Sequence, residues 1–258
     1  MCTHKENDAA SKMGEIDLRD RLAHVYNDQI SEYQHLVEVA SAIKKLDPIR
    51  DEIILDIGCG TGRITYKLLE SGCKIVGLDF SGESLRVCKS RCDELNHRRD
   101  DFCLIRGDAC NLPLKNDFFD KCISSEVLEH VPSKIERLKM ILEIHRVLKP
   151  RGRLLLTTYN HSLRKIMGKK KETAENAPLY AYRYNYFELK KLISHVFKGE
   201  VKIVGILNLR HWVPKTFLGK FKNQFVAVDV FIEKTPFSYL LAHLLSVECA
   251  KPIMLENK

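Results

Sequence analysis

The chain has 258 residues and a formal net charge of +8, with 45% hydrophobic and 29% charged residues. A chain of this length corresponds to one large domain, and it can bury enough surface to fold without disulfides or metals. Residues 1–15 suggest no signal peptide, no stretch approaches the roughly 20 apolar residues of a membrane span, and the nine cysteines are odd in number. These features argue against secreted, membrane-spanning and disordered proteins and predict a cytoplasmic chain with reduced thiols.

Helical patterns alternate with short apolar runs over the first 160 residues. A helical pattern over residues 15–46 precedes Ile53–Ile57, a short apolar run that ends in glycines and is typical of a buried parallel strand. This alternation predicts βαβ units and a doubly wound, mostly parallel sheet. Further strands are predicted over residues 74–79, 102–106, 121–125 and 153–158. The helices between them are predicted to bury Ile64, Leu68 and Leu69; Leu85, Cys88 and Cys92; and Ile135, Leu138, Leu142 and His145.

The last third of the chain departs from this alternation. Asn185 and Glu188 have the spacing of a capping box, as do Ser133 and Glu136 earlier, and they predict the start of one more helix. Residues 201–207 and 224–233 have the pattern of strands with no helix between them, which predicts an antiparallel pair at the edge of the sheet. Residues 236–247 predict a short apolar helix, which could pack in the core, pack on a partner or dock on a membrane surface.

A glycine-rich loop, Asp56-Ile57-Gly58-Cys59-Gly60-Thr61-Gly62, follows the first predicted strand. Glycines allow a tight turn and a close approach of the backbone to a ligand. A dinucleotide-binding loop would have its third glycine at position 63, where this chain has Arg63. The acid two residues before the first glycine suits a cofactor with a cationic amino-acid end and no pyrophosphate. A tight turn without a ligand is the alternative.

Acidic residues also follow the next two predicted strands. Asp79 ends the second strand, where a carboxylate can accept hydrogen bonds from both hydroxyls of a ribose. Asp108 follows the third strand and can accept a hydrogen bond from an adenine amino group. One acid at a strand end is usually a helix cap or a solvated turn. Acids at three successive strand ends around one glycine loop instead predict a nucleoside site.

A run of motifs over about residues 50–160 resembles the class I S-adenosylmethionine-dependent methyltransferases. The run is typical of the branch that includes the ubiquinone- and menaquinone-biosynthesis enzymes. The resemblance implies a Rossmann-like methyltransferase fold, with a seven-stranded sheet whose last strand is antiparallel, and S-adenosyl-L-methionine as the cofactor. The motifs are residues 54–62, 76–81, 107–109 with Leu112 and Pro113, 119–131 and 148–152.

The resemblance also implies which residues bind the cofactor, and the cysteine spacing predicts no metal site. Cys88 and Cys92 lie one helical turn apart and no C-x-x-C pair occurs, so a zinc site is not expected. The implied residues are Asp56, Gly58, Cys59, Gly60, Thr61 and Gly62 at the methionine end, Asp79 at the ribose with Phe80 after it, Asp108 and Ala109 at the adenine, and Ser124, Ser125 and Glu126 under the methionine and the transferred methyl.

Several motif residues differ from those of other methyltransferase groups, which argues against the activities of those groups. Residues 124–127 read Ser-Ser-Glu-Val where amino-methyltransferases of nucleobases and glutamine have Asn/Asp-Pro-Pro-aromatic. Cytosine C5 enzymes have a nucleophilic Cys after a Pro in that loop, whereas Cys122 lies inside the predicted strand and is expected in the core. Glu126 and Glu129 are too close in sequence to be the two glutamates of protein arginine methyltransferases.

Two features at the acceptor end carry open alternatives. Four tyrosines recur at every second position from Tyr180 to Tyr186, so an extended chain would place their rings on one side. They could pack on the sheet or form an aromatic wall over an apolar or cationic substrate. His130 is the best-placed candidate for a general base, with a structural histidine bonded to the backbone as the alternative. No catalytic residue is therefore assigned.

The sequence predicts one methyltransferase domain over residues 1–258. It would comprise an N-terminal helical cap (1–45), a cofactor-binding core (46–160), and a substrate lid with C-terminal strands and helix (161–258), in which the lid covers residues 161–186. The predicted function is methyl transfer to an O, N or C atom of a small-molecule or lipid-like metabolite. The alternatives are an RNA or protein methyltransferase that uses basic loops, and a non-catalytic accessory subunit that binds the cofactor.

Basic residues cluster in two places, and their use stays open. Such clusters are usually solvated loops, but they also suit anionic substrates, lipid surfaces or RNA. The expected partner is a small or lipid-like molecule rather than nucleic acid, with peripheral contact to a membrane surface as an option and the oligomeric state undetermined. The clusters are Arg164, Lys165 and Lys169 to Lys171, and Lys215, Lys220 and Lys222.

Overall fold

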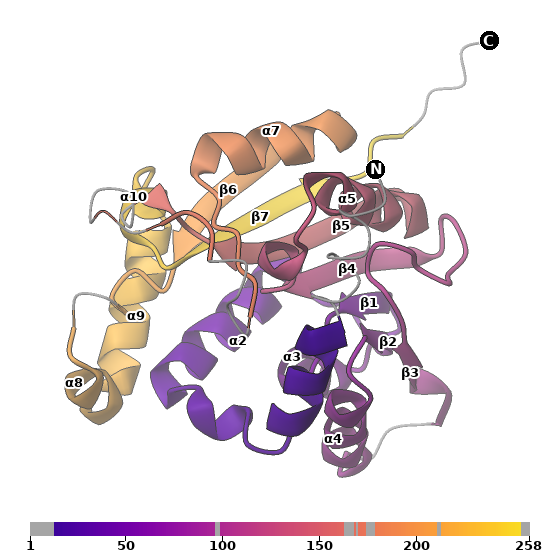
Figure 1. Cartoon of the computed structure of the whole chain (residues 1–258), viewed down its shortest axis with the longest axis horizontal. Coiled ribbons are helices and arrows are strands. Elements are labelled where there is room, and N and C mark those ends of the chain that lie inside the picture. Colours follow the sequence, from indigo (N-terminus) through magenta and orange to yellow (C-terminus); the bar gives the residue numbers. More distant parts are fainter. Residues whose placement is uncertain are drawn as a thin grey trace.

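The computed structural model describes residues 13–95, 99–162, 168, 170–173, 179–210 and 213–253. Within them, seven strands form one sheet in the order β3-β2-β1-β4-β5-β7-β6 (Figure 1). The strands are β1 (Ile53–Ile57), β2 (Lys74–Asp79), β3 (Phe102–Arg106), β4 (Phe119–Ser125), β5 (Leu148–Tyr159), β6 (Val201–Ile206) and β7 (Leu244–Ala250).

The strand pairing confirms the predicted fold class. β1 pairs in parallel with β2 and β4, and parallel pairing continues to β3 on one side and to β5 on the other. β7 runs antiparallel to both β5 and β6, so an antiparallel pair forms this edge of the sheet. The chain proceeds outward from β1 to β3 and then returns to β4 on the other side of β1. At such a point the loops after the two central strands diverge and leave a crevice for a ligand.

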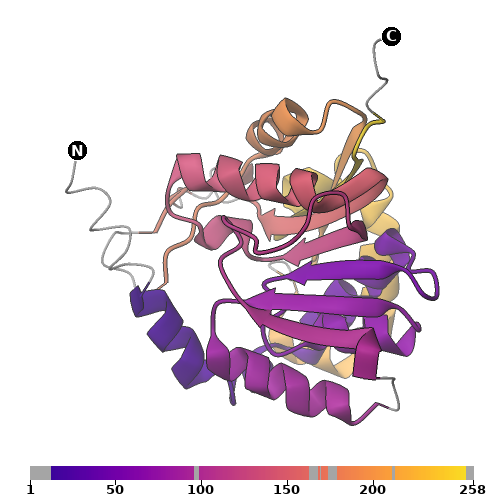
Figure 2. The same ribbon diagram turned by 90° about the vertical axis from the view of Figure 1, so that its right-hand side faces the viewer.

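Helices cover both faces of the sheet (Figure 2). On one face, α2, α3 and α4 pack through an apolar cluster that contains Leu46, Leu68 and Cys88. On the other, α5 and α7 pack on the main core, which contains Ile144 and Ile193. The helices are α2 (Glu32–Leu46), α3 (Arg63–Glu70), α4 (Gly82–Asp93), α5 (Lys134–Val147), α7 (Tyr186–Val196), α8 (Lys215–Lys220), α9 (Lys222–Glu233) and α10 (Ser238–Leu241), with 3-10 turns η1 (Asn27–Gln29), η2 (Arg99–Asp101) and η3 (Leu128–His130).

Several helices start directly after a polar residue whose side chain caps the first backbone N–H groups. The capping box of Asn185 and Glu188 is present in full at the start of α7. Ser133 caps α5 by accepting from the N–H of Ile135. The long helix predicted over residues 15–46 is interrupted: residues 13–22 are helical, turns follow, and α2 starts only after Ser31, whose side chain accepts from the N–H of Gln34. This break brings the N-terminal segment over the end of the sheet.

The inward face predicted for α5 is wrong. Ile135 is 79% exposed, and Leu142 is exposed as well. The buried face of α5 instead contains Arg137, Met140, Ile141, Ile144 and Val147. Both sets have helical spacing, so periodicity alone could not choose between them.

The predicted C-terminal elements are also wrong in part. Residues 224–233 belong to helix α9 rather than to a strand, and the partner of β6 is β7, whose first residues fall in the segment predicted as a helix. Only Ser238–Leu241 of that segment is helical. The run from Phe225 to Ile232 is almost entirely apolar, so it lacks the polar face by which a surface helix is recognised.

Candidate active site

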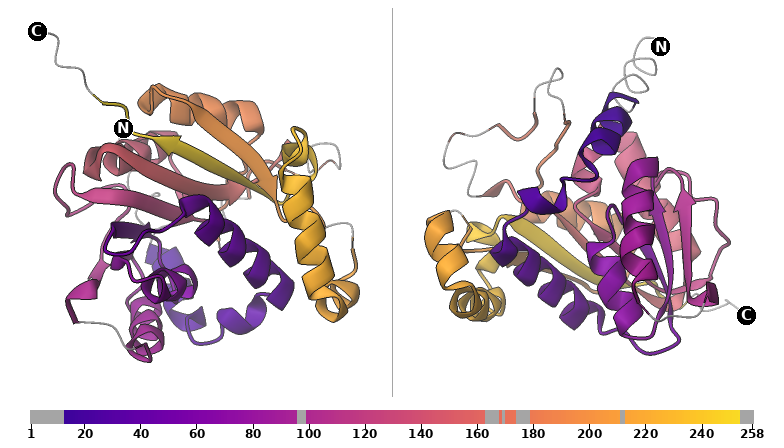
Figure 3. Two further views of the ribbon diagram at one scale, coloured as in Figure 1. Left: turned by 180° about the vertical axis from the view of Figure 1, so that it is seen from behind. Right: turned by 90° about the horizontal axis from the view of Figure 1, so that it is seen from below.

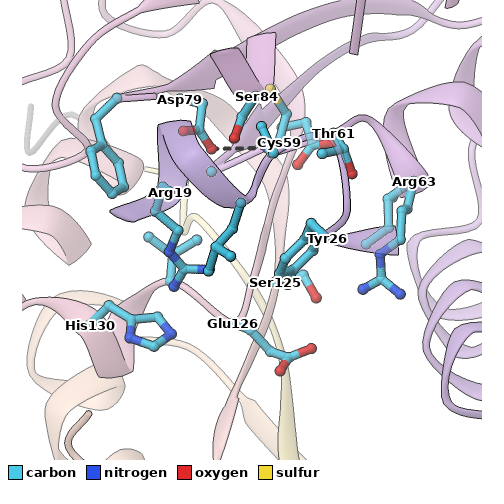
Figure 4. Close-up of a pocket in the computed structure, with 18 of the residues that line it drawn as sticks. Arg19, Tyr26, Cys59, Thr61, Arg63, Asp79, Ser84, Ser125, Glu126 and His130 are labelled. Atoms are coloured by element: carbon cyan, nitrogen blue, oxygen red, sulfur yellow. Dashed lines mark hydrogen bonds between the residues drawn. The ribbon is translucent and has the colours of Figure 1, made fainter. Parts of the chain in front are cut away.

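A cavity lies at the carboxyl ends of β1, β2 and β4, where the strand order reverses. The glycine loop, the loop after β4 and the N-terminal helix line it (Figure 4). A smaller cavity adjoins it and shares Glu15, Phe80, Val127 and His130 with it. The two cavities therefore form one cleft at the position that an open parallel sheet favours for ligand binding.

The three glycines of the loop all have positive φ, at 71°, 51° and 79°. A Cβ on Gly58 would lie 2.2 Å from Val127 Cγ2, and a Cβ on Gly62 would lie 2.6 Å from Cys88 Sγ. Packing of the protein itself therefore requires these two glycines. A Cβ on Gly60 would meet no atom within 4 Å. Gly60 is thus the glycine whose missing side chain leaves space in the cavity rather than in the core.

Asp79 is held in one orientation beside this space. Its Oδ2 accepts from the N–H of Gly60 at 2.9 Å, and its Oδ1 accepts from the N–H of Ser81 at 2.9 Å. Burial raises the pKa of Asp79 above its usual range, although the two backbone bonds oppose this shift. The carboxylate lines the cavity and keeps lone pairs that can accept from a ligand.

Asp56 lies at the end of β1, beneath the loop. Its Oδ2 accepts from the hydroxyl of Thr65 at 2.6 Å, which ties β1 to α3. Burial raises the pKa of Asp56 to about 6. Asp56 also lines the cavity, together with Cys59 and Thr61, and the hydroxyl of Thr61 donates to Asn27 Oδ1 at 2.8 Å.

The other residues implied by the family motifs divide into two groups. Asp108 and Ala109 line the adjoining cavity, and Ser125 lines the main one. Ser124 is fully buried in β4 and lines neither cavity, because neighbouring side chains of a strand point to opposite faces. Gly62 likewise faces Cys88 rather than the cavity.

Glu126 has an unusual backbone conformation at the floor of the cavity. Its φ is 56°, which costs a non-glycine residue about 1 kcal/mol or more. Its N–H donates to the carbonyl of Thr157 at 3.1 Å, and its carboxyl points into the cavity (Figure 4). Burial, with Glu38 and Glu129 nearby, raises the pKa of Glu126 well above its usual range.

The N-terminal segment contributes residues that sequence reasoning missed. Glu15, Arg19, Leu22 and Tyr26 all line the cavity, although the sequence predicted only a helical cap. The spacing of Glu15, Arg19 and Leu22 places them on one face of the N-terminal helix, and Tyr26 lies in the turns that follow. Arg19 Nη2 lies 3.5 Å from Glu15 Oε1, so a cation and a carboxylate enter the cavity together.

His130 is hydrogen-bonded to the backbone, as expected for the alternative in which it is a structural histidine. Its Nδ1 lies 2.7 Å from the carbonyl oxygen of Tyr180. Because a carbonyl only accepts, Nδ1 carries the hydrogen and Nε2 is left as an acceptor. Burial, and next the charge of Arg19, lower the pKa of His130 to about 3. A neutral imidazole therefore lines both cavities.

The tyrosine stripe packs on the protein and not on the cavity. Tyr184 is 4% exposed and belongs to the main core, and Tyr182 and Tyr186 pack against it. Tyr182 lies between two cations, with Arg137 at 4.2 Å and Lys171 at 4.8 Å from the ring centre. None of the four tyrosines lines the main cavity. The packing interpretation is confirmed, while residues 163–167, 169 and 174–178 of the predicted lid lie outside the described residues.

Metal-site arrangements and membrane-spanning helices are both absent from the described residues. No group of His, Cys, Asp and Glu side chains in them has the arrangement of a metal site. In the same part of the chain, no helix combines the length and the apolar character that a membrane crossing needs.

The middle of the chain is similar to known methyltransferases. The family model described as "Methyltransferase domain" matches residues 55–156. The chloroplastic 2-phytyl-1,4-beta-naphthoquinone methyltransferase of Arabidopsis thaliana is 35% identical over 153 residues, which are 56% of this chain and 57% of that protein. The demethylmenaquinone methyltransferase of Lactococcus lactis subsp. lactis (strain IL1403) is 32% identical over 155 residues, 55% of this chain and 60% of that protein.

A third relative has a different named substrate. The tRNA (carboxymethyluridine(34)-5-O)-methyltransferase of Arabidopsis thaliana is 36% identical over 107 residues, 42% of this chain and 24% of that protein. The chain thus spans less than two thirds of the length of each of these relatives.

A solved structure shares the fold over nearly the whole chain. It is the complex of the Haloferax volcanii Trm112 methyltransferase activator with a putative methyltransferase, with a TM-score of 0.65, 18% identity, and coverage of 91% of this chain and 98% of that one. At this identity the likeness shows the fold alone. Residues 55–156 therefore match a methyltransferase domain, and the two quinone-named relatives match about the same share of the chain as each other.

Proposed function

We propose that this chain transfers a methyl group from S-adenosylmethionine to an O, N or C atom of a small, lipid-like metabolite, with a quinone-type ring compound as the acceptor. The observation that carries the proposal is the cavity in which open space over Gly60 adjoins the fixed carboxylate of Asp79. The names of two relatives support the acceptor class, since both are methyltransferases of naphthoquinone or menaquinone compounds.

We assign the cofactor to the side of the cleft that the glycine loop forms. Asp79 would accept from the ribose hydroxyls, with each bond to the charged carboxylate worth about 1.5–3 kcal/mol. Gly60 would let the backbone approach the methionine end, because a Cβ would occupy that space. Phe80, Asp108 and Ala109 would surround the adenine in the adjoining cavity. Asp56, Gly58, Cys59, Thr61, Ser125 and Glu126 complete the assignment. Gly62 and Ser124 line neither cavity and are left out of it.

The bound cofactor supplies a methyl group that is already activated, so the protein chiefly has to orient the acceptor and exclude water. Leu22 and Tyr26 would cover the acceptor with apolar surface, and Arg19 and Glu126 would provide polar contacts. His130 Nε2 can accept a hydrogen bond from an acceptor hydroxyl. With its pKa lowered to about 3, His130 is a weak base, and we assign it an orienting role.

The test is transfer of a labelled methyl group from S-adenosylmethionine into cell extract, followed by separation of lipid, aqueous, RNA and protein fractions. We expect the label in the lipid fraction, and at least about tenfold less of it with Asp79→Ala. The matched control is Asp93→Ala, an exposed acid at the end of α4 that pairs with Lys89, which should label like the wild type. Label in the RNA or protein fraction alone would contradict the proposed acceptor.

One observation favours RNA methylation as a second candidate, namely the 36% identity to a tRNA methyltransferase. The basic clusters give it less support, because Lys171 pairs with Glu188 and Lys222 pairs with Glu32. Binding through phosphate contacts would weaken steeply with salt. A salt-sensitive shift of RNA mobility, together with label in the RNA fraction, would establish this candidate instead. Cofactor binding without label in any fraction would favour the accessory subunit.

The proposal extends to organisation and location. A single domain, in which residues before α2 cover the cofactor core and residues after β5 close the acceptor end, accounts for the contributions of Arg19 and Leu179 to one cavity. The described cysteines are all free thiols, which suits the reducing conditions of a cytoplasm.

A further inference from the structure

Helix α9 has exposed Asn223 and Gln224 near its start, and it places both of its acidic side chains on its inner side. Asp229 is buried and accepts from the Tyr33 hydroxyl of α2, and from the N–H of Asn208 at 3.0 Å and of Leu209 at 3.2 Å. One turn later, Glu233 pairs with Lys45 of α2 and accepts from the Ser41 hydroxyl at 3.1 Å. Both acids of α9 are therefore committed to contacts within the protein.

The outer side of α9 is apolar, and α8 extends it. Phe231 is 69% exposed and Val228 is 46% exposed, and Phe217 and Phe221 are exposed and stacked on each other with ring centres 6.5 Å apart. Val228 and Phe231 lie three residues apart on one face of α9, whereas Phe217 lies on α8 and Phe221 lies at its junction with α9. We call these four exposed side chains the apolar stripe. α10 adds exposed Phe237, Leu240 and Leu241 close by in sequence. Surface helices normally show the reverse polarity, and exposed apolar patches of this kind mark interaction surfaces.

The charges that remain around the apolar stripe are positive. Lys220 and Lys234, both exposed, lie just before α9 and just after its last residue. Between residues 216 and 241 the only acids are Asp229 and Glu233, which face inward. An apolar face bounded by lysines is the pattern of a helix that lies in the interface of an anionic membrane.

We propose that the apolar stripe of α8 and α9 docks this protein on the surface of a membrane that contains anionic lipids. α8 and α9 lie at one end of the molecule, beside α2 (Figure 3). A second copy of the chain fits this surface less well, because self-association in an antiparallel or parallel arrangement would bring lysines near lysines without acids to neutralise them.

The apolar stripe lies near one side of the cleft, so docking would also affect how a lipid-like acceptor reaches it. Lys222, the first residue of α9, pairs with Glu32, the first residue of α2. Gln29, which lines the cavity, lies three residues before Glu32. Docking would therefore hold this side of the cleft near the lipid from which a lipid-like acceptor comes. This consequence rests on the proposed function, whereas the docking itself does not.

The test is co-sedimentation with vesicles of phosphatidylcholine alone and of phosphatidylcholine mixed with phosphatidylglycerol. We expect the wild type to sediment with the mixed vesicles and to be released by salt, and the double variant Val228→Glu/Phe231→Glu to bind at least about tenfold more weakly. The matched control is Ile135→Glu/Phe187→Glu, in which the replaced side chains are 79% and 74% exposed on α5 and α7 across the sheet. This control should bind like the wild type.

Three outcomes would overturn the docking: no sedimentation of the wild type with mixed vesicles, equal loss in the control, or a dimer in sedimentation equilibrium that the stripe variant abolishes without any vesicle binding. Calorimetry with S-adenosylmethionine separates this result from the proposed function. The stripe variant should keep the cofactor affinity of the wild type, which also shows that it is folded. Failure of the methyl transfer assay would leave the vesicle result standing.

Discussion

The two sides of the cleft are built in different ways. On the proposed cofactor side, Asp56, Gly60 and Asp79 all come from the single β1–α3–β2 unit. The N–H of Gly60 donates to Asp79, and Asp56 accepts from the Thr65 hydroxyl of α3. On the acceptor side, Arg19, Glu126 and Leu179 come from three segments that are far apart in the sequence. The cofactor side is thus a local structure that recurs wherever its motif does, while the acceptor side exists only after the whole chain has folded. The predictions below test this difference.

The largest effect is expected from Tyr184→Ala, at a core position of the segment after β5 that we propose closes the acceptor end. Tyr184 is buried in the main core, so truncation should lower the free energy of unfolding by about 3–5 kcal/mol, as for other large aromatic residues. Urea denaturation measures the change. Phe187→Ala, at an exposed position of α7, is the control and should stay close to the wild type. A Tyr184→Ala variant that keeps its stability but loses turnover would show that the tyrosines contact the acceptor after all.

Asp79→Ala should give the largest effect on the cofactor side. The loss of up to two bonds to the ribose, at about 1.5 kcal/mol each, predicts a Kd for S-adenosylmethionine that rises by tens- to a few-hundred-fold. Stability without cofactor should also fall, by about 1–2 kcal/mol, because the N–H groups of Gly60 and Ser81 lose their acceptor. Isothermal titration calorimetry gives the Kd, and an unchanged value would refute the ribose assignment.

The buried carboxyl of Glu129 should make the free energy of unfolding depend on pH, even without cofactor. Burial raises the pKa of Glu129 to about 8 in the folded protein, against about 4.3 in an unfolded chain. Between these values the unfolded chain has released a proton that the folded protein retains. The free energy of unfolding should therefore fall with rising pH, by up to about 1.4 kcal/mol per pH unit.

The check on Glu129 is urea denaturation of the wild type and of Glu129→Gln between about pH 5 and 8. Glu129 is fully buried and its Oε2 accepts from the Thr158 hydroxyl at 3.0 Å, which the amide oxygen of the variant can replace. The stability of the variant relative to the wild type should rise with pH. Parallel curves would mean that Glu129 titrates in its ordinary range.

Asp108→Asn should have the smallest effect. The amide oxygen can still accept from the N–H of Cys110, as Asp108 Oδ1 does at 2.9 Å, so the turn should be kept. The NH2 group of the Asn side chain then replaces Asp108 Oδ2 and cannot accept from the adenine amino group, so this one contact, worth about 1.5 kcal/mol, is lost and the Kd should rise about tenfold. Calorimetry beside Asp79→Ala compares the two positions. A larger increase of the Kd for Asp108→Asn than for Asp79→Ala would contradict this prediction.

The sequence predicted β1, β2, β4 and β5 because each contains buried apolar residues next to a helix, and it predicted β3 although none of its residues is fully buried. It could not predict α9, since an apolar outer face removes the periodicity that distinguishes a surface helix from a strand. It also missed the break after residue 22, where turns replace the helix without a proline or glycine as a signal.

The candidate site also contains residues that the sequence could predict and residues that it could not. The motif placed Asp56, Gly60 and Asp79 correctly around one cavity because the strand ends fix them locally. Ser124 could be separated from Ser125 only with the direction of each side chain along β4. Arg19 reaches the cavity through a chain reversal that no local pattern specifies, so only the tertiary structure could reveal it.

The backbone of Glu126 bears on how this protein would respond to selection. Its φ of 56° is a conformation that glycine adopts without strain, so Glu126→Gly should relieve about 1 kcal/mol in the folded backbone, offset in part by the greater freedom of the unfolded chain. A library screened only for thermal resistance would therefore tend to favour loss of this carboxyl, and the recovered variants would trade turnover for heat tolerance. Retention of glutamate in a library screened for turnover would indicate that activity maintains the strained residue.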